Sequence, residues 1–137
     1  MFKKVVFCVL CLQLWSPAYL VAAEEAAPIS SSYQYFELEP DIITNYIKPG
    51  KKLGYIRVGI DLMVKSNKAL EEVELHEPLI RDRIITVLGE QSEEKIRSVN
   101  ERQGIRLSCL NAVNDAIFEV TGDRPVEDLL FTKYLEQ

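Results

Sequence analysis

Hydrophobic and polar residues alternate most regularly between residues 55 and 64. Aliphatic side chains occupy every second position there: Ile56, Val58, Ile60, Leu62 and Val64. A period of two predicts a half-buried β-strand, with one face on a core and the other in solvent. Residues 35–38 and 42–47, on either side of Pro40, are rich in strand formers and predict one interrupted strand or two short ones. Pro49-Gly50 predicts the turn that follows.

Helical spacing replaces this alternation after Ser66-Asn67. Asn67 is expected to cap a helix from Lys68 to about Glu77, where Pro78 forces a break or kink. Pro78 also suits the first turn of a second helix that runs through Leu88. One face of that helix is apolar: Leu79, Ile80, Ile84, Val87 and Leu88. Ser92, followed by two glutamates, predicts the start of another short helix.

The main amphipathic helix is expected from about Glu101 to Thr121, with Gly122 just past its end. Its apolar or small positions recur at helical spacing: Ile105, Cys109, Ala112, Val113, Ala116, Ile117 and Val120. Residues 126–135 are rich in strand formers and predict a last strand.

The first 23 residues have the organisation of an export signal. Lys3 and Lys4 precede an apolar run over residues 5–14, and a small-residue exit ends at Ala23, where we expect cleavage. The run is about half of the roughly 20 apolar residues that a spanning helix needs, which argues against a membrane-spanning helix. The alternative is a leader that is retained as a membrane anchor. Residues 24–32 are small and polar and predict a flexible linker, which leaves 33–137 as one domain.

Charge and cysteine content exclude several functions. The net charge is −5, and loss of the leader with its two lysines makes it −7. This argues against nucleic acid and against attraction to anionic lipid. Loss of Cys8 and Cys11 leaves Cys109 without an intramolecular disulfide partner, and its place in an apolar helical stripe predicts that it is buried.

Candidate catalytic and metal-binding groups are sparse. His76 is the single histidine, and a Cys-His pair would need Cys109 in an exposed, electropositive setting. Three acidic residues alternate along an extended segment, where they form either a cation site or, as we expect, a solvated strand face: Glu37, Glu39 and Asp41. Phosphate loops, zinc pairs and nucleophile elbows are absent from the sequence. We therefore expect neither enzymatic activity nor a metal or cofactor.

Four short blocks occur in a characteristic order. They are Leu38-Glu39-Pro40 with Asn45; Pro78-Leu79-Ile80-Arg81-Asp82; Ile105, Cys109, Val113 and Asn114; and Val126, Leu129, Leu130, Phe131, Thr132, Tyr134 and Gln137. In this order they resemble the FliL family of flagellar basal body-associated proteins, from about Tyr35 to Gln137. Glu101 and Cys109 stand where the family often has a glycine and an aliphatic residue. The removable leader differs from the family's usual transmembrane helix.

The resemblance implies an α+β fold with a curved, antiparallel-rich sheet and helices packed on one side, similar to the stomatin and prohibitin core. It implies a periplasmic, non-enzymatic protein without a cofactor, which forms a homo-oligomeric ring around flagellar stator proteins and supports motor torque. Association with the inner membrane would then come through partners or an uncleaved leader.

The candidate partner interface has two parts. Arg81, Asp82 and Arg83 lie on the helix after Pro78, and Tyr35 and Asn45 lie on an edge strand able to add to a neighbour's sheet. The plainer interpretation is an ordinary charged helix surface and a short edge blunted by acidic residues and proline. The alternative function is a soluble periplasmic ligand-binding or envelope-maintenance module with a pocket between sheet and helix.

Overall fold

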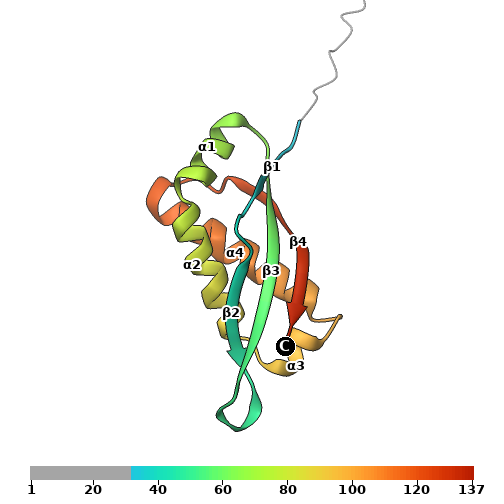
Figure 1. Ribbon diagram of the computed structural model, residues 1–137. Coiled ribbons are helices and arrows are strands. Elements are labelled where there is room, and N and C mark those ends of the chain that lie inside the picture. The colour runs from blue at the N-terminus through green and yellow to red at the C-terminus, as the bar shows by residue number, and fades with distance from the viewer. Residues whose placement is uncertain (1–31) are drawn as a thin grey trace, which may run out of the picture.

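The computed structural model describes residues 32–137. The predicted export signal and residues 24–31 of the linker therefore lie outside the described residues. Strands β1 (Gln34–Glu37), β2 (Ile42–Ile47), β3 (Leu53–Val64) and β4 (Val126–Glu136) form one antiparallel sheet. Helices α1 (Asn67–Leu75), α2 (Glu77–Gly89), α3 (Glu93–Arg97) and α4 (Arg102–Thr121) pack on one side of it (Figure 1). The predicted α+β fold is confirmed.

The long strand β3 organises the sheet. β1 pairs with residues 61–64 of β3 and β2 pairs with residues 53–58, both along the same edge (Figure 1). Between them the Leu38 N–H donates to the Ile60 carbonyl at 2.9 Å. The two short strands are thus one strand interrupted at residues 39–41, where the Glu39–Pro40 peptide is cis. β4 pairs with the opposite edge of β3.

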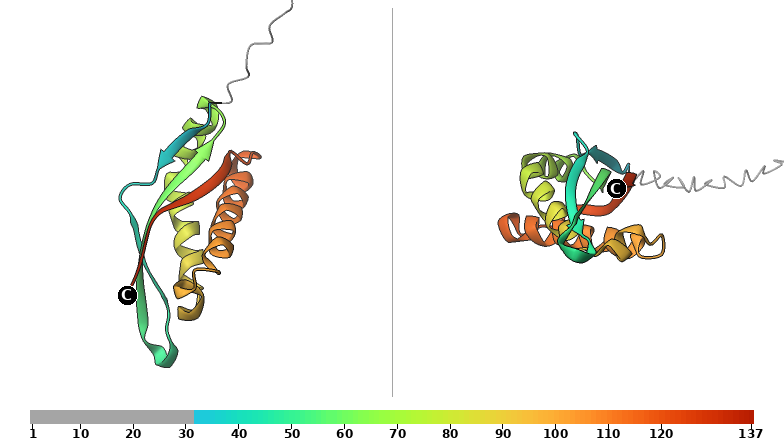
Figure 2. Two further views of the ribbon diagram at one scale, coloured as in Figure 1. Left: turned by 90° about the vertical axis from the view of Figure 1, so that its right-hand side faces the viewer. Right: turned by 60° about the horizontal axis from the view of Figure 1, so that its bottom comes forward.

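The alternating residues of β3 form the centre of the core. Its five aliphatic side chains at even-numbered positions are at most 1% exposed. They pack with buried residues of all four helices: Val73 of α1, Ile80, Ile84 and Leu88 of α2, Ile96 of α3, and Ile105, Cys109, Val113 and Ile117 of α4. Each such side chain contributes about 1.5–3 kcal/mol when fully buried. The edge view in Figure 2 shows the two layers, sheet and helices, that this core holds together.

The start of α1 differs from the prediction. Ser66, and not Asn67, is the N-cap, because its Oγ accepts a hydrogen bond from the Ala69 N–H at 3.1 Å. Asn67 is the first helical residue instead. The observed end of α1 at Leu75 lies two residues before the expected end at about Glu77. The break predicted at Pro78 is confirmed, since a new helix, α2, opens at Glu77 with a proline in its first turn.

The other helix signals are confirmed with one exception. Ser92 caps α3 by accepting from the Lys95 N–H at 3.4 Å. Gly122 ends α4 with φ +81°, a left-handed conformation that favours glycine. Val120 was expected in the buried stripe but is 59% exposed, because nothing in residues 32–137 covers that position at the end of the helix.

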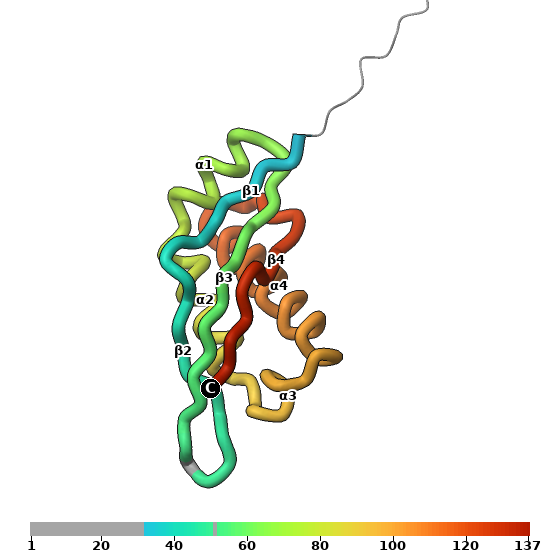
Figure 3. Tube along the Cα trace, turned by 45° about the vertical axis from the view of Figure 1, so that its right-hand side comes forward, coloured from blue at the N-terminus to red at the C-terminus, as the bar shows by residue number. Residues whose placement is uncertain are grey.

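The β2–β3 hairpin extends past the helical layer at one end of the molecule, and the start of β1 lies with α1 at the other (Figures 2 and 3). A short 3-10 turn, Pro49–Lys51, forms the tip, with Gly50 at φ +74°. At the base of the hairpin the Tyr46 ring lies directly against Gly54, and the Tyr46 hydroxyl donates to the Gln137 carbonyl at 3.0 Å. Among the described helices none is both long and apolar enough to cross a bilayer.

Candidate interaction surface

The face of the sheet opposite the helices carries many exposed apolar side chains. Five of them, all in the half nearer the hairpin, are 53–64% exposed: Ile43, Ile47, Leu53, Tyr55 and Leu135. We call these five residues the open-face patch. Strand register brings them together, because Ile43 and Leu135 lie on opposite sides of Arg57, and Ile47 lies opposite Leu53. A contiguous apolar patch on a folded domain marks an interaction surface.

The patch encloses a shallow hollow of about 390 Å³. Its lining is mostly apolar, with one charged group: Ile43, Tyr55, Ile56, Arg57, Leu135 and Gln137. Its volume is at the lower end of the roughly 300–1,000 Å³ typical of ligand pockets. The space between sheet and helices is filled by core side chains, so this hollow lies on the outer face of the sheet.

Asp41 connects three strands beside the patch. Its Oδ2 accepts hydrogen bonds from Lys133 Nζ and from Arg57 Nε, each at 2.6 Å. These bonds, first that of Lys133 and then that of Arg57, hold the pKa of the Asp41 carboxyl below its ordinary value. The bonds join the loop between β1 and β2 to both β3 and β4, and so fix the relative positions of the strands under the patch.

Gly59 provides the space for this network. A Cβ atom at this position would come within 2.6 Å of Thr132 Oγ1 and 3.2 Å of Asp41 Oδ1. Glycine is therefore required by the close approach of neighbouring side chains.

The expected solvated acidic face is confirmed, although only Glu37 lies within a strand. Glu37 ends β1, and Glu39 and Asp41 belong to the loop around Pro40, yet all three line one open hollow together with Arg57 and Lys133. Asp41 forms ion pairs there with the side chains of Arg57 and Lys133. Within residues 32–137 no group of three His, Cys, Asp or Glu side chains is placed to hold a metal ion.

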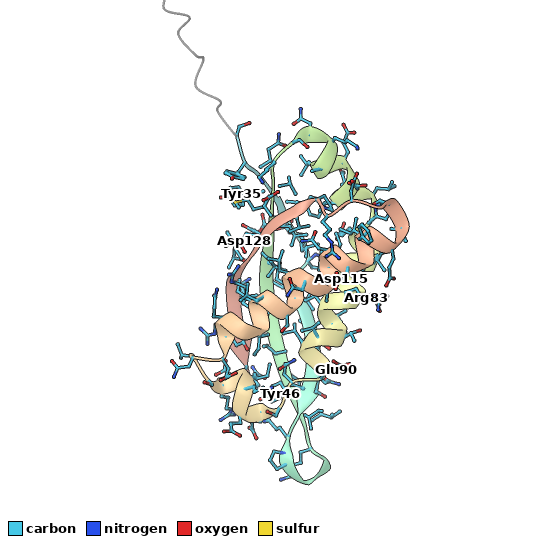
Figure 4. All side chains as sticks on the ribbon, turned by 180° about the vertical axis from the view of Figure 1, so that it is seen from behind. Tyr35, Tyr46, Arg83, Glu90, Asp115 and Asp128 are labelled. Atoms are coloured by element: carbon cyan, nitrogen blue, oxygen red, sulfur yellow. The ribbon has the colours of Figure 1, made fainter. Side chains whose placement is uncertain are left out.

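The structure divides the five predicted interface residues between two sides of the molecule. Tyr35 and Asn45 are exposed on the open face, where Asn45 lies opposite Tyr55 of the patch and Tyr35 lies opposite Met63, further from the hairpin. Arg83 lies with α2 on the helical side, as the rear view in Figure 4 shows. Its neighbours in sequence, residues 81 and 82, are on the same helix.

Arg81 has a structural role. Its Nη2 donates to the Pro40 carbonyl at 2.7 Å, and its Nη1 faces Glu77 Oε1 at 3.7 Å. The side chain thus ties α2 to the loop between β1 and β2. Asp82 is exposed and Arg83 is half-buried. The assignment of these residues to an interface stays a prediction.

Sequence reasoning missed the open-face patch, although the signal was present. Strand β2 has apolar residues on both of its faces: Ile42 and Tyr46 on the buried face, Ile43 and Ile47 on the other. A half-buried strand next to solvent normally alternates apolar with polar residues. Apolar residues on both faces therefore indicate a second contact surface.

The candidate catalytic pair is not assembled. Cys109 is 0% exposed, as predicted, and burial raises the pKa of its thiol to about 12. His76 lies at the junction of α1 and α2, where its Nδ1 is 2.8 Å from the Glu72 carbonyl oxygen. A thiol with this pKa is protonated at neutral pH and is a poor nucleophile.

Comparison with known proteins gives two matches. The family model described as "Flagellar basal body-associated protein FliL" matches residues 35–137, which begin within β1 and include every later element. The "Flagellar protein FliL" of Aquifex aeolicus (strain VF5) is 30% identical over 115 residues, which cover 84% of this chain and 68% of the relative.

Proposed function

Because this chain belongs to the FliL family of flagellar basal body-associated proteins, we propose that it is a non-enzymatic accessory of the flagellar motor that binds stator proteins and supports torque. The observation that carries this proposal is the open-face patch, five large apolar side chains left exposed in a domain whose core is otherwise complete. Such a surface is suited to holding a partner protein.

The physical properties of the sheet fit a scaffolding role. The patch is built on three hydrogen-bonded strands that Asp41 ties together, so its side chains are presented on a rigid frame. Rigid surfaces bind with a smaller loss of conformational entropy. A stable contact buries roughly 800 Å² on each partner, so a partner would also have to cover residues around the patch.

We further propose that the protein works in the periplasm, after export by its N-terminal segment, and reaches the inner membrane through its partners or an uncleaved leader. Several copies would form a ring around the stator. Surfaces away from the patch, including Asp82 and Tyr35, are available for contacts between copies.

A deletion strain tests this function. Loss of the chain should impair swimming or swarming while growth and envelope integrity stay normal. An envelope defect with intact motility would instead indicate a ligand-binding or envelope-maintenance module.

Crosslinking in living cells tests the partner directly. A photoreactive amino acid at position 55, in the patch, should crosslink the chain to a stator protein. The same amino acid at the exposed position 107 on α4 is the matched control and should not. Absence of stator proteins from the position-55 products would contradict the proposal.

A further inference from the structure

Arg57 lies at the end of the open-face patch that is farther from the hairpin tip. Strand register places it between Ile43 and Leu135, and its side chain is 52% exposed. Its Nε donates to Asp41, whereas its two terminal amino groups make no hydrogen bond within residues 32–137. Arg57 thus presents a pair of unused, planar donors at the border between the mostly apolar 390 Å³ hollow and a polar hollow, which is lined by Glu37, Glu39, Pro40, Asp41, Arg57 and Lys133.

Arg57 is the charged side chain among the residues that line the hollow, although the chain as a whole carries −5. Asp41 is bound by both Arg57 and Lys133, so this trio retains one positive charge. In the hairpin, Lys52 is exposed, whereas Lys48 is paired with Glu93 at 3.8 Å. The hollow and its arginine are therefore complementary to a partner segment that is apolar and presents a carboxylate.

We propose that the open-face patch binds a protein segment in which a carboxylate is flanked by apolar side chains, and that Arg57 selects that carboxylate through its terminal amino groups. A guanidinium and a carboxylate form two parallel hydrogen bonds in such a pair. A neighbouring apolar side chain of the segment enters the hollow. This inference deepens the proposed function and rests on it only in assigning the segment to a motor protein.

Two other occupants fit the surface less well. Insertion into a lipid bilayer would carry Arg57 and Asp41 towards the apolar phase together with Ile43 and Leu135, which is costly for charged groups. Two copies meeting face to face about a twofold axis would bring their Arg57 side chains together, and like charges repel.

Peptide selection tests the proposal without a motor protein. Random peptides displayed on phage are selected on the chain as purified from its cells, and the selected sequences are synthesised for affinity measurements. We expect them to share an Asp or Glu next to apolar residues. Arg57→Gln should weaken their binding about tenfold or more, and Ile43→Ser should also weaken it.

Matched variants make the result specific. Leu107→Ser removes an exposed apolar side chain from α4 and should leave binding unchanged. Replacing the peptide's carboxylate by an amide should weaken binding to the unmodified chain but cause little further loss with Arg57→Gln. Ile43 is an exposed side chain, so Ile43→Ser tests the surface even if Arg57→Gln disturbs the sheet.

The inference is overturned if no peptide is enriched, if enriched peptides lack a carboxylate, or if Arg57→Gln and Ile43→Ser bind as well as the unmodified chain. It is also overturned if Arg57→Gln abolishes self-association in sedimentation analysis or binding to phosphatidylcholine–phosphatidylglycerol vesicles, since the occupant would then be a second copy or lipid. If peptides bind as expected but photocrosslinking captures no stator protein, the proposed function fails and the binding chemistry stands.

Discussion

At the scale of single residues, the sheet depends on side chains that fit into spaces left by glycine. The Tyr46 ring lies where a side chain at position 54 would be, and a Cβ there would come within 2.2 Å of the ring. Tyr46 is 1% exposed and is held by its hydrogen bond to Gln137, so the ring cannot move aside without loss of packing.

We therefore expect Gly54→Ala to lower the free energy of unfolding by about 1–3 kcal/mol, the usual cost of overpacking a core. Urea denaturation measures the effect. The matched control is Gly104→Ala on α4, where a Cβ would meet nothing within 4 Å. That substitution should raise stability by up to about 1 kcal/mol, because alanine favours the helix. Equal effects at both positions would contradict the packing of Tyr46 on Gly54.

At the scale of secondary structure, the hydrogen bonds of two charged side chains hold the interrupted strand β1–β2 in place. Asp41 fixes it to the sheet, and Arg81 fixes it to α2. Both contacts meet at the loop around Pro40, the one point where the edge of β3 lacks a regular partner strand.

The contribution of Asp41 should depend on pH. Its pKa in the folded chain is lowered from the ordinary 3.8, so the native state keeps the carboxylate ionised at pH values where the unfolded chain takes up a proton. The stabilisation is therefore complete above 3.8 and is lost as pH falls through the lowered pKa. In unfolding experiments at neutral pH, Asp41→Asn should have a lower free energy of unfolding than the unmodified chain. This difference in the free energy of unfolding should disappear in acid.

Glu39→Gln is the control for this titration. Glu39 lies in the same loop and is exposed, so its substitution should not lower the free energy of unfolding comparably at neutral pH. If the loss of stability in Asp41→Asn persisted unchanged into strong acid, the charge of the carboxylate would not be what joins the strands.

Arg81→Ala should lower the free energy of unfolding by about 1–2 kcal/mol, since it removes a charged hydrogen bond that is only partly screened by solvent. Asp82→Ala changes the adjacent, exposed position and should stay within about 0.5 kcal/mol. Chemical denaturation of the two variants side by side gives the comparison. If Arg81→Ala lowered the free energy of unfolding no more than Asp82→Ala does, the hydrogen bond between α2 and the Pro40 loop would not contribute to stability.

At the scale of the whole molecule, local patterns predicted most elements because their signals lie within a few residues. The alternation in β3, the cap at Ser92 and the stop at Gly122 are of this kind. The features that were not predicted depend on which elements lie opposite one another in the fold. One is the exposure of Val120. The other is the assembly of the patch from residues of β2, β3 and β4. Arg81 was likewise assigned to a surface because its partner lies 41 residues away.

In the assembled molecule, helices cover one face of the sheet and leave the other open (Figure 2). The exposed apolar residues of the patch lie on the open face, towards the hairpin. We interpret this asymmetry as a separation of stability from binding. The helical side buries the core and stabilises the domain, and the open side is the surface that we propose binds a partner protein.

The stall torque of single flagellar motors tests the central claim most directly. In cells that lack this chain but still assemble filaments, we expect a stall torque below that of the parent strain. Expression of the unmodified chain should restore the torque, whereas the Ile43→Ser Leu135→Ser double variant should not. A stall torque equal to that of the parent in cells without the chain would contradict the account.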